Sequence, residues 1–148
     1  MITRSSGFSL IELLVVVAII GILSAVGVVS YSGYVNSSKK KTAVNSLYQI
    51  GLAQTEFFSE NREYKVDADV SCPADLDTTQ EIETSLLGGL GVLTEVEGRT
   101  RRPKFDFTFG VDDALIGDYE IQAEQDTTGS ACIITLNSSN ELDKTLCP

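Results

Sequence analysis

The sequence predicts an α+β protein in which one long N-terminal helix packs, through its second half, on a small antiparallel β-sheet. Three patterns indicate this fold. An unbroken apolar run covers residues 8–29, helical periodicity continues to about residue 60, and strand-like alternation dominates the last third of the chain. The 148 residues are enough for one membrane-length helix followed by one small globular domain.

The N-terminal segment predicts a membrane anchor. Residues 1–7 are polar and carry one positive charge, at Arg4, and a basic flank of this kind is retained in the cytoplasm. The apolar run from Phe8 to about Val29 is roughly 20 residues long, which is enough to span a bilayer. An ordinary secretory signal has a shorter apolar stretch that is followed by its cleavage site. We therefore expect this helix to stay attached to the domain.

Glu12 is the only charged residue between Arg4 and Lys39. A carboxylate within a membrane-length segment costs roughly 2.5–3.5 kcal/mol at the bilayer centre, so it is usually functional and has a counter-charge. The best candidate is an α-amine that is created when the chain is cut between Gly7 and Phe8. Such a cut would remove the cytoplasmic leader, residues 1–7, and leave the helix in place.

The run from Gly7 to Leu23, GFSLIELLVVVAIIGIL in one-letter code, resembles the class III signal of type IV prepilins. The resemblance is close over about the first 30 residues and holds only in general plan beyond them. It implies the pilin fold, cleavage after Gly7 by a membrane prepilin peptidase, and methylation of the new Phe8 amine. Glu12 would then pair with the Phe8 amine of a neighbouring subunit in a filament.

The chain departs from the family at two positions in the long helix. Many type IV pilins have proline where this chain has Val29, and another near Gln49. Gly21, Gly27 and Gly33 remain in the helix, and each weakens it by about 1 kcal/mol relative to alanine. The sequence leaves open whether the helix melts near Gly21–Gly27 in a filament.

From residue 30 to residue 60 the helix is expected to continue in amphipathic form. Apolar residues recur at mostly three- or four-residue steps, which marks one helical face: Tyr31, Tyr34, Ala43, Leu47, Ile50, Ala53 and Phe57. Lys39, Lys40 and Lys41 could contact anionic lipid head groups or acidic subunits, or could form a solvated face.

Residues 61–148 predict the globular head, which begins with a connecting αβ-loop over residues 61–103. A capping box formed by Thr78 and Glu81 predicts a short helix at about 78–87, with Gly88 as its stop. A sheet is expected at about 104–136, with strands at Phe105–Phe109, Tyr119–Ala123 and Cys132–Leu136, and a fourth strand near Leu142–Leu146.

One basic cluster stands out in an otherwise acidic domain: Arg99, Arg101, Arg102 and Lys104. It is a candidate contact for a polyanion such as DNA, or for acidic neighbouring subunits, although a short charged loop is usually just solvated. Nucleic acid is the less favoured partner, because four cations give a weak phosphate footprint and no aromatic platform lies beside them.

The three cysteines, Cys72, Cys132 and Cys147, all lie beyond the membrane segment and would face an oxidising compartment. We expect a disulfide between Cys132 and Cys147, as in the C-terminal loops (here 132–147) of many type IV pilins. Cys72 is the odd one, and the sequence alone does not fix the connectivity.

No pattern in the chain predicts catalysis, a cofactor or a metal site. There is no histidine and no tryptophan, the formal net charge is −10, and no nucleophile motif is present. Asp112, Asp113 and Asp118 could hold calcium, but their spacing fits no EF-hand loop, so a turn is favoured. The protein is therefore not expected to be an enzyme.

The resemblance implies a structural subunit that polymerises through its N-terminal helix into a type IV pilus filament used for adhesion, motility or DNA uptake. Its partners would be other copies of itself, the prepilin peptidase, the inner-membrane assembly machinery and, before assembly, lipid. The precursor would sit in the bacterial inner membrane and the product outside the cell. The alternatives are a minor pilin, a type II secretion pseudopilin, or a membrane-anchored binding domain that never polymerises.

Overall fold

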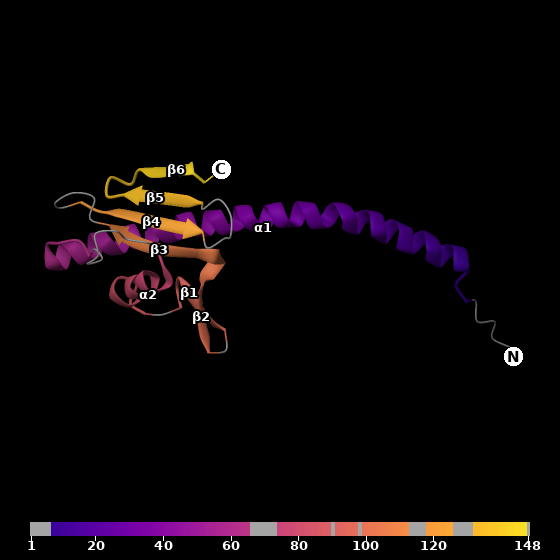
Figure 1. The fold of residues 1–148 in the computed structure, drawn as a ribbon, viewed down its shortest axis with the longest axis horizontal. Coiled ribbons are helices and arrows are strands. Elements are labelled where there is room, and N and C mark those ends of the chain that lie inside the picture. The colour runs from indigo at the N-terminus through magenta and orange to yellow at the C-terminus, as the bar shows by residue number, and fades with distance from the viewer. Residues whose placement is uncertain are drawn as a thin grey trace. The chain divides into compact units, whose positions relative to one another are not determined.

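The computed structural model describes residues 7–65, 74–89, 91–97, 99–112, 118–125 and 132–147, and for residue 29 only the backbone. The predicted α+β class is confirmed (Figure 1). In chain order the elements are α1 (Leu10–Asn61), α2 (Leu76–Ser85), β1 (Thr94–Glu97), β2 (Thr100–Pro103), a 3₁₀ turn η1 (Lys104–Asp106), β3 (Phe107–Asp112), β4 (Glu120–Gln125), β5 (Ile133–Asn137) and β6 (Leu142–Leu146). The chain forms two compact units, residues 1–38 and residues 39–148.

The first unit is the apolar part of α1. Its large side chains are open to the surroundings, from Leu10 at 82% exposed to Val15 at 47%. A window of this helix has a mean hydropathy of 2.8, so it is long and apolar enough to cross a membrane. Tyr31 and Tyr34, which share the predicted amphipathic face, are also exposed in this unit. An exposed apolar surface of this size marks a site of contact with a membrane or with another protein surface.

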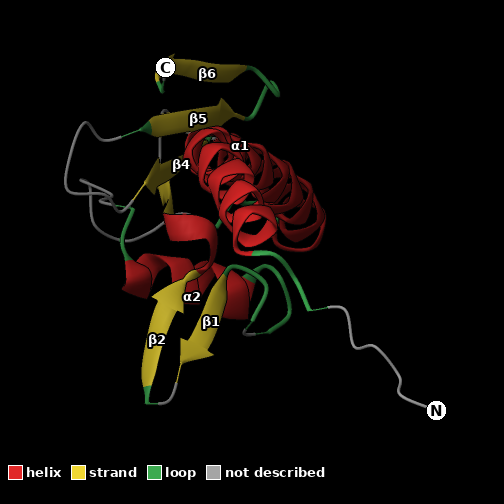
Figure 2. Cartoon of the chain, turned by 90° about the vertical axis from the view of Figure 1, so that its right-hand side faces the viewer, coloured by secondary structure: helices red, strands yellow, loops and turns green. Residues whose placement is uncertain are grey.

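The second unit has its core where the later part of α1 meets a four-stranded sheet. Ala43, Leu47 and Ile50 are buried at the helical spacing expected for one face, and Phe57 is half-buried. At Gly51 the helix approaches the sheet closely, because an added Cβ would lie 3.5 Å from both the Leu136 side chain and the Tyr119 hydroxyl. Figure 2 shows α1 lying beside β4 and β5.

The sheet has the order β3-β4-β5-β6, and every neighbouring pair is antiparallel. The predicted fourth strand is confirmed as β6. The first strand begins later than expected, because Phe105 and Asp106 adopt left-handed backbone conformations with φ of 60° and 61°. An extended strand cannot pass through such residues, so Phe105 lies outside β3 and is exposed.

Helix α2 covers the free edge of β3. The Phe109 N–H donates to the Thr79 hydroxyl at 2.8 Å, and the Thr78 hydroxyl donates to the Phe109 carbonyl at 2.8 Å. These bonds satisfy backbone groups that an edge strand would otherwise leave open. Thr108 of β3 is also buried, and its hydroxyl donates to the Ala74 carbonyl, just before α2.

The predicted capping box of Thr78 and Glu81 is wrong, because α2 begins two residues earlier. Asp75 is the N-cap, and its carboxylate accepts the Thr78 N–H at 2.8 Å while the Thr78 hydroxyl accepts the Asp75 N–H at 3.0 Å. Thr78 therefore takes the place in the box that we gave to Glu81. Gly88 follows the helix with φ of 74°, as expected for a residue beyond a stop.

Residues 61–103, expected as a connecting loop with one helix, also contain a β-hairpin. Strands β1 and β2 pair from Thr94↔Pro103 to Glu97↔Thr100. Charged and polar residues dominate both strands, so their sequence lacks the apolar alternation that predicts a strand. In both views the hairpin projects from the head on the side opposite β6 (Figures 1 and 2).

A buried glutamine fixes the chain where it leaves α1. Gln54 is fully buried; its side-chain oxygen accepts the Lys65 N–H at 2.9 Å, and its amide donates to the Lys65 carbonyl. The Tyr64 ring stacks on Phe58 at 4.6 Å between centroids and meets Tyr119 edge-on at 4.7 Å. The residues that follow α1 are thereby held against the helix itself and against Tyr119, directly before β4.

Candidate functional site

The N-terminal candidate site is the first turn of α1. Glu12 lies in that turn, and one oxygen of its carboxylate accepts the Ser9 backbone N–H at 2.8 Å. The helix N-terminus carries a partial positive charge, so a carboxylate is stabilised there. Phe8, where the leader would be cut, is 86% exposed. Phe8 and Glu12, which the sequence singled out, are therefore close along the chain, and both are exposed.

The carboxylate of Glu12 keeps further hydrogen-bonding capacity. An ionised carboxylate offers about four lone-pair sites on two oxygens, and the bond from Ser9 uses one of them. Its second oxygen can accept an ammonium group without loss of the cap. Such charge-assisted bonds are roughly twice as strong as neutral ones.

The C-terminal candidate is the disulfide loop. Cys132 and Cys147 are joined by a disulfide, with a sequence separation of 15 residues. Cys132 is buried beside β5, and Cys147 packs against the core at the end of β6. The link fastens the edge strand β6 to its neighbour. Cys72 lies outside the described residues.

Loss of this disulfide is expected to destabilise the head by about 3 kcal/mol, because it closes a loop of about 15 residues in the unfolded chain. Urea unfolding of wild-type protein and of Cys132→Ser, both in detergent, would measure the difference. The mass of Cys72→Ser should remain two hydrogens below that of its reduced form. Equal unfolding midpoints for the first pair would contradict the prediction.

A buried carboxylate that we did not single out organises the base of the hairpin. Glu83 of α2 is fully buried and accepts four hydrogen bonds. The donors are the backbone N–H groups of Gly91, Leu93 and Thr94, the first at 3.1 Å and the last at 2.7 Å, and the Thr94 hydroxyl at 2.6 Å. The backbone of residues 91–94 is therefore bound at three N–H groups by one side chain.

This network keeps Glu83 ionised. Burial raises the pKa of its carboxyl, but the hydrogen bonds from the Thr94 hydroxyl and from the three backbone N–H groups together lower it further, so the pKa lies below its usual value. The Arg101 guanidinium, 3.9 Å away, balances the negative charge. The sequence signal for this site was weak: a glutamate one position after Ile82, before a glycine-rich loop.

The four cations of the basic cluster have separate environments. Arg101 donates to the Thr94 hydroxyl at 2.8 Å beside Glu83, and Arg102 pairs with Glu97 at 2.9 Å. The Lys104 ammonium donates to the Gly91 carbonyl. Arg99 is exposed in the connection between β1 and β2. Three of the four cations are thus engaged within the head.

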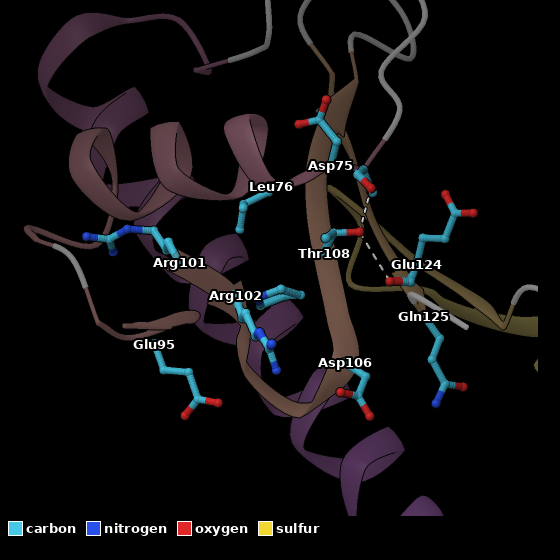
Figure 3. Close-up of a pocket in the computed structure, with 11 residues that line it drawn as sticks. Asp75, Leu76, Glu95, Arg101, Arg102, Asp106, Thr108, Glu124 and Gln125 are labelled. Carbon is cyan, nitrogen blue, oxygen red and sulfur yellow. Dashed lines mark hydrogen bonds between the residues drawn. The ribbon is translucent and has the colours of Figure 1, made fainter. Parts of the chain in front are cut away.

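Arg101 and Arg102 also line a groove of about 720 Å³ together with carboxylates of the same molecule. Its lining residues are Ala74, Asp75, Leu76, Glu95, Arg101, Arg102, Pro103, Asp106, Thr108, Glu124 and Gln125. Figure 3 shows the two guanidinium groups pointing in different directions, as expected for neighbours on one strand. Lys39 of α1 pairs with Asp106 at its rim. The groove therefore presents mixed charge.

Comparison with known proteins identifies the N-terminal segment. Residues 2–28 match the family model described as the prokaryotic N-terminal methylation motif. The type IV major pilin protein PilA of Myxococcus xanthus is 44% identical over 61 residues, covering 41% of this chain and 28% of that protein.

Two fimbrial proteins are similar over longer stretches. EcpC of Eikenella corrodens is 33% identical over 91 residues, covering 60% of each chain. A fimbrial protein of Pseudomonas aeruginosa is 36% identical over 88 residues, covering 57% of this chain and 54% of its own. The chain thus spans between 28% and 60% of the length of these curated relatives. No solved structure matches the chain significantly.

Proposed function

We propose, because this chain belongs to the type IV pilin family, that it is a structural subunit of a type IV pilus. As a pilin it is a structural protein and not an enzyme. It would be made as a precursor in the bacterial inner membrane and polymerised into an extracellular filament. One observation carries the proposal: an exposed apolar helix whose first turn holds a single carboxylate, directly after the Gly7-Phe8 bond.

In this proposal the prepilin peptidase cuts the Gly7-Phe8 bond and methylates the new amine. The Glu12 carboxylate accepts that ammonium from a neighbouring subunit through the oxygen capacity left beside Ser9. The apolar side chains then pass from lipid to a bundle of identical helices. This transfer has a small net cost because one apolar environment replaces another.

The proposed partners follow from the same residues. They are other copies of the chain, the peptidase, the membrane assembly machinery and the lipid that holds the precursor. We also propose how the chain divides into parts: a leader (1–7), a membrane helix (8–29), its continuation (30–60) and a head (61–148). We propose further that the basic cluster, Arg99, Arg101, Arg102 and Lys104, contacts other subunits rather than DNA.

Intact mass spectrometry of filaments sheared from the cell surface tests the proposal. A dominant chain that begins at methylated Phe8 would support a structural pilin. A processed chain that is present only in traces would favour a minor pilin or a pseudopilin. A chain that still begins at Met1 and stays in membranes would overturn the proposal and leave a membrane-anchored binding domain.

A further inference from the structure

A second groove, of about 380 Å³, lies where the ends of α1 and α2 meet. Ala53, Glu56, Phe57 and Glu60 of α1 line it together with residues 85–88 at the end of α2. We call it the two-helix groove. It belongs to the head and lies apart from the hairpin, none of whose residues line it.

The charge of the two-helix groove is negative from two independent sources. Glu56 and Glu60 lie one helical turn apart on the same face of α1. Both helices also end here with no basic residue in the last turn, so the partial negative charges of their C-termini add to those of the carboxylates. A cation that enters the groove would meet both carboxylates and both helix ends.

The cations nearest along the chain do not fill this groove. Lys65 pairs with Glu81 at 2.8 Å, and neither residue lines the groove. Arg62 follows α1 directly but is exposed and is not among the residues that line the groove. The groove therefore has room for a cation from elsewhere.

The walls of the groove suit an arginine more than a small ion. Phe57, Leu86 and Leu87 are half-buried, so part of each remains open as an apolar surface. The aliphatic stem of a long basic side chain can lie on such a surface while its charged end stays near the carboxylates. An aromatic ring such as Phe57 adds a cation–π contact, for which arginine is the commoner partner.

The β1–β2 hairpin, which projects from the head, carries a cation that suits the two-helix groove. Arg99 is exposed in the connection of the hairpin, whereas Arg101 and Arg102 are held by Glu83, Thr94 and Glu97. The Glu83 network fixes the base of this hairpin through the backbone of residues 91–94. The hairpin that carries Arg99 is therefore fixed to α2 at its base, and it projects from the head (Figure 1).

We propose that the two-helix groove of one subunit binds Arg99 on the β1–β2 hairpin of a second copy. The inference rests on the proposed function and adds a contact between heads to the contact between helices. Groove and hairpin are different surfaces of one chain, so the interface is head-to-tail and can repeat without closing. Such an interface suits a helical filament.

Carbodiimide cross-linking of intact filaments tests the contact, with Arg99→Lys to supply an amine while the positive charge is kept. The reagent joins an amine to a carboxylate only where the two touch. Filaments assembled from chains labelled with light and with heavy nitrogen should yield mixed-label peptides that join position 99 to Glu56 or Glu60. Absence of such peptides, or same-label pairs alone, would overturn the inference.

Charge reversal gives a second test. Arg99→Glu should reduce filament yield about tenfold, equivalent to about 1.4 kcal/mol, and Glu60→Arg in the same chain should restore most of it. Lys144→Glu makes the same charge change on exposed β6 and should leave the yield unchanged. A loss with Lys144→Glu equal to that with Arg99→Glu, or no rescue by the paired change, would contradict the contact.

The two proposals fail in distinguishable ways. Wild-type filaments that contain chains beginning at Phe8 but give no cross-link to Glu56 or Glu60 would remove only the contact between heads. A wild-type chain that never enters filaments would remove the proposed function and the contact with it.

Discussion

Glu12→Leu is expected to leave membrane insertion intact and to reduce the amount of assembled filament by at least about tenfold, a free-energy change of about 1.4 kcal/mol. Leucine removes the cost of a carboxylate within an apolar segment, so insertion becomes easier. Assembly loses the group that would accept the Phe8 amine of the neighbouring subunit. The measurement is an immunoblot of sheared filaments against carbonate-washed membranes.

Glu12→Gln separates charge pairing from helix capping. The glutamine side-chain oxygen can still accept the Ser9 N–H, as the Glu12 carboxylate does at 2.8 Å, but it carries no charge. If charge pairing drives assembly, Glu12→Gln should assemble as poorly as Glu12→Leu. Normal yield from Glu12→Gln would mean that the carboxylate acts as a cap, and normal yield from both would remove the pairing argument.

Glu83→Gln should destabilise the head by about 3 kcal/mol. The glutamine NH₂ group cannot accept the hydrogen bonds that a buried carboxylate accepts here, and Arg101 loses its counter-charge. Urea unfolding of the full chain in detergent, followed by tyrosine fluorescence, measures the loss. Glu81→Gln is the matched control, because Glu81 makes an exposed pair with Lys65 that is worth at most about 1 kcal/mol.

The Glu83 network also predicts a pH dependence. The folded-state pKa of Glu83 lies below its usual value of about 4.3, so its ionised form favours folding. The contribution of ionised Glu83 to the free energy of unfolding is complete at a pH above the usual pKa. It is lost as the pH falls toward and through the lower folded-state pKa. Stability measured between neutral and acidic pH should therefore fall less steeply in Glu83→Gln than in wild type. Parallel curves would show that Glu83 contributes nothing to acid sensitivity.

The sequence predicted the features that depend on local periodicity. The apolar run, the length of α1, the buried face at Ala43, Leu47 and Ile50, and the strand β6 all follow from patterns repeated within a few turns or residues. Glu12 was recognisable because a carboxylate within a long apolar segment is costly and is therefore usually functional. The disulfide partners were expected from the resemblance, and the structure joins the same two cysteines.

Tertiary structure decided what depends on groups far apart in the chain. The hairpin β1–β2 has few apolar residues, and its base is bound by the buried carboxylate of Glu83. The N-cap of α2 is Asp75 and not the expected Thr78. The helix itself is bound to the edge of β3 through Thr79 and Phe109. The basic cluster was continuous in sequence, yet folding pairs Arg101, Arg102 and Lys104 with other groups and leaves Arg99 exposed. Hydrogen bonds and charge pairs across the fold have no sequence period, so only the three-dimensional arrangement could reveal them.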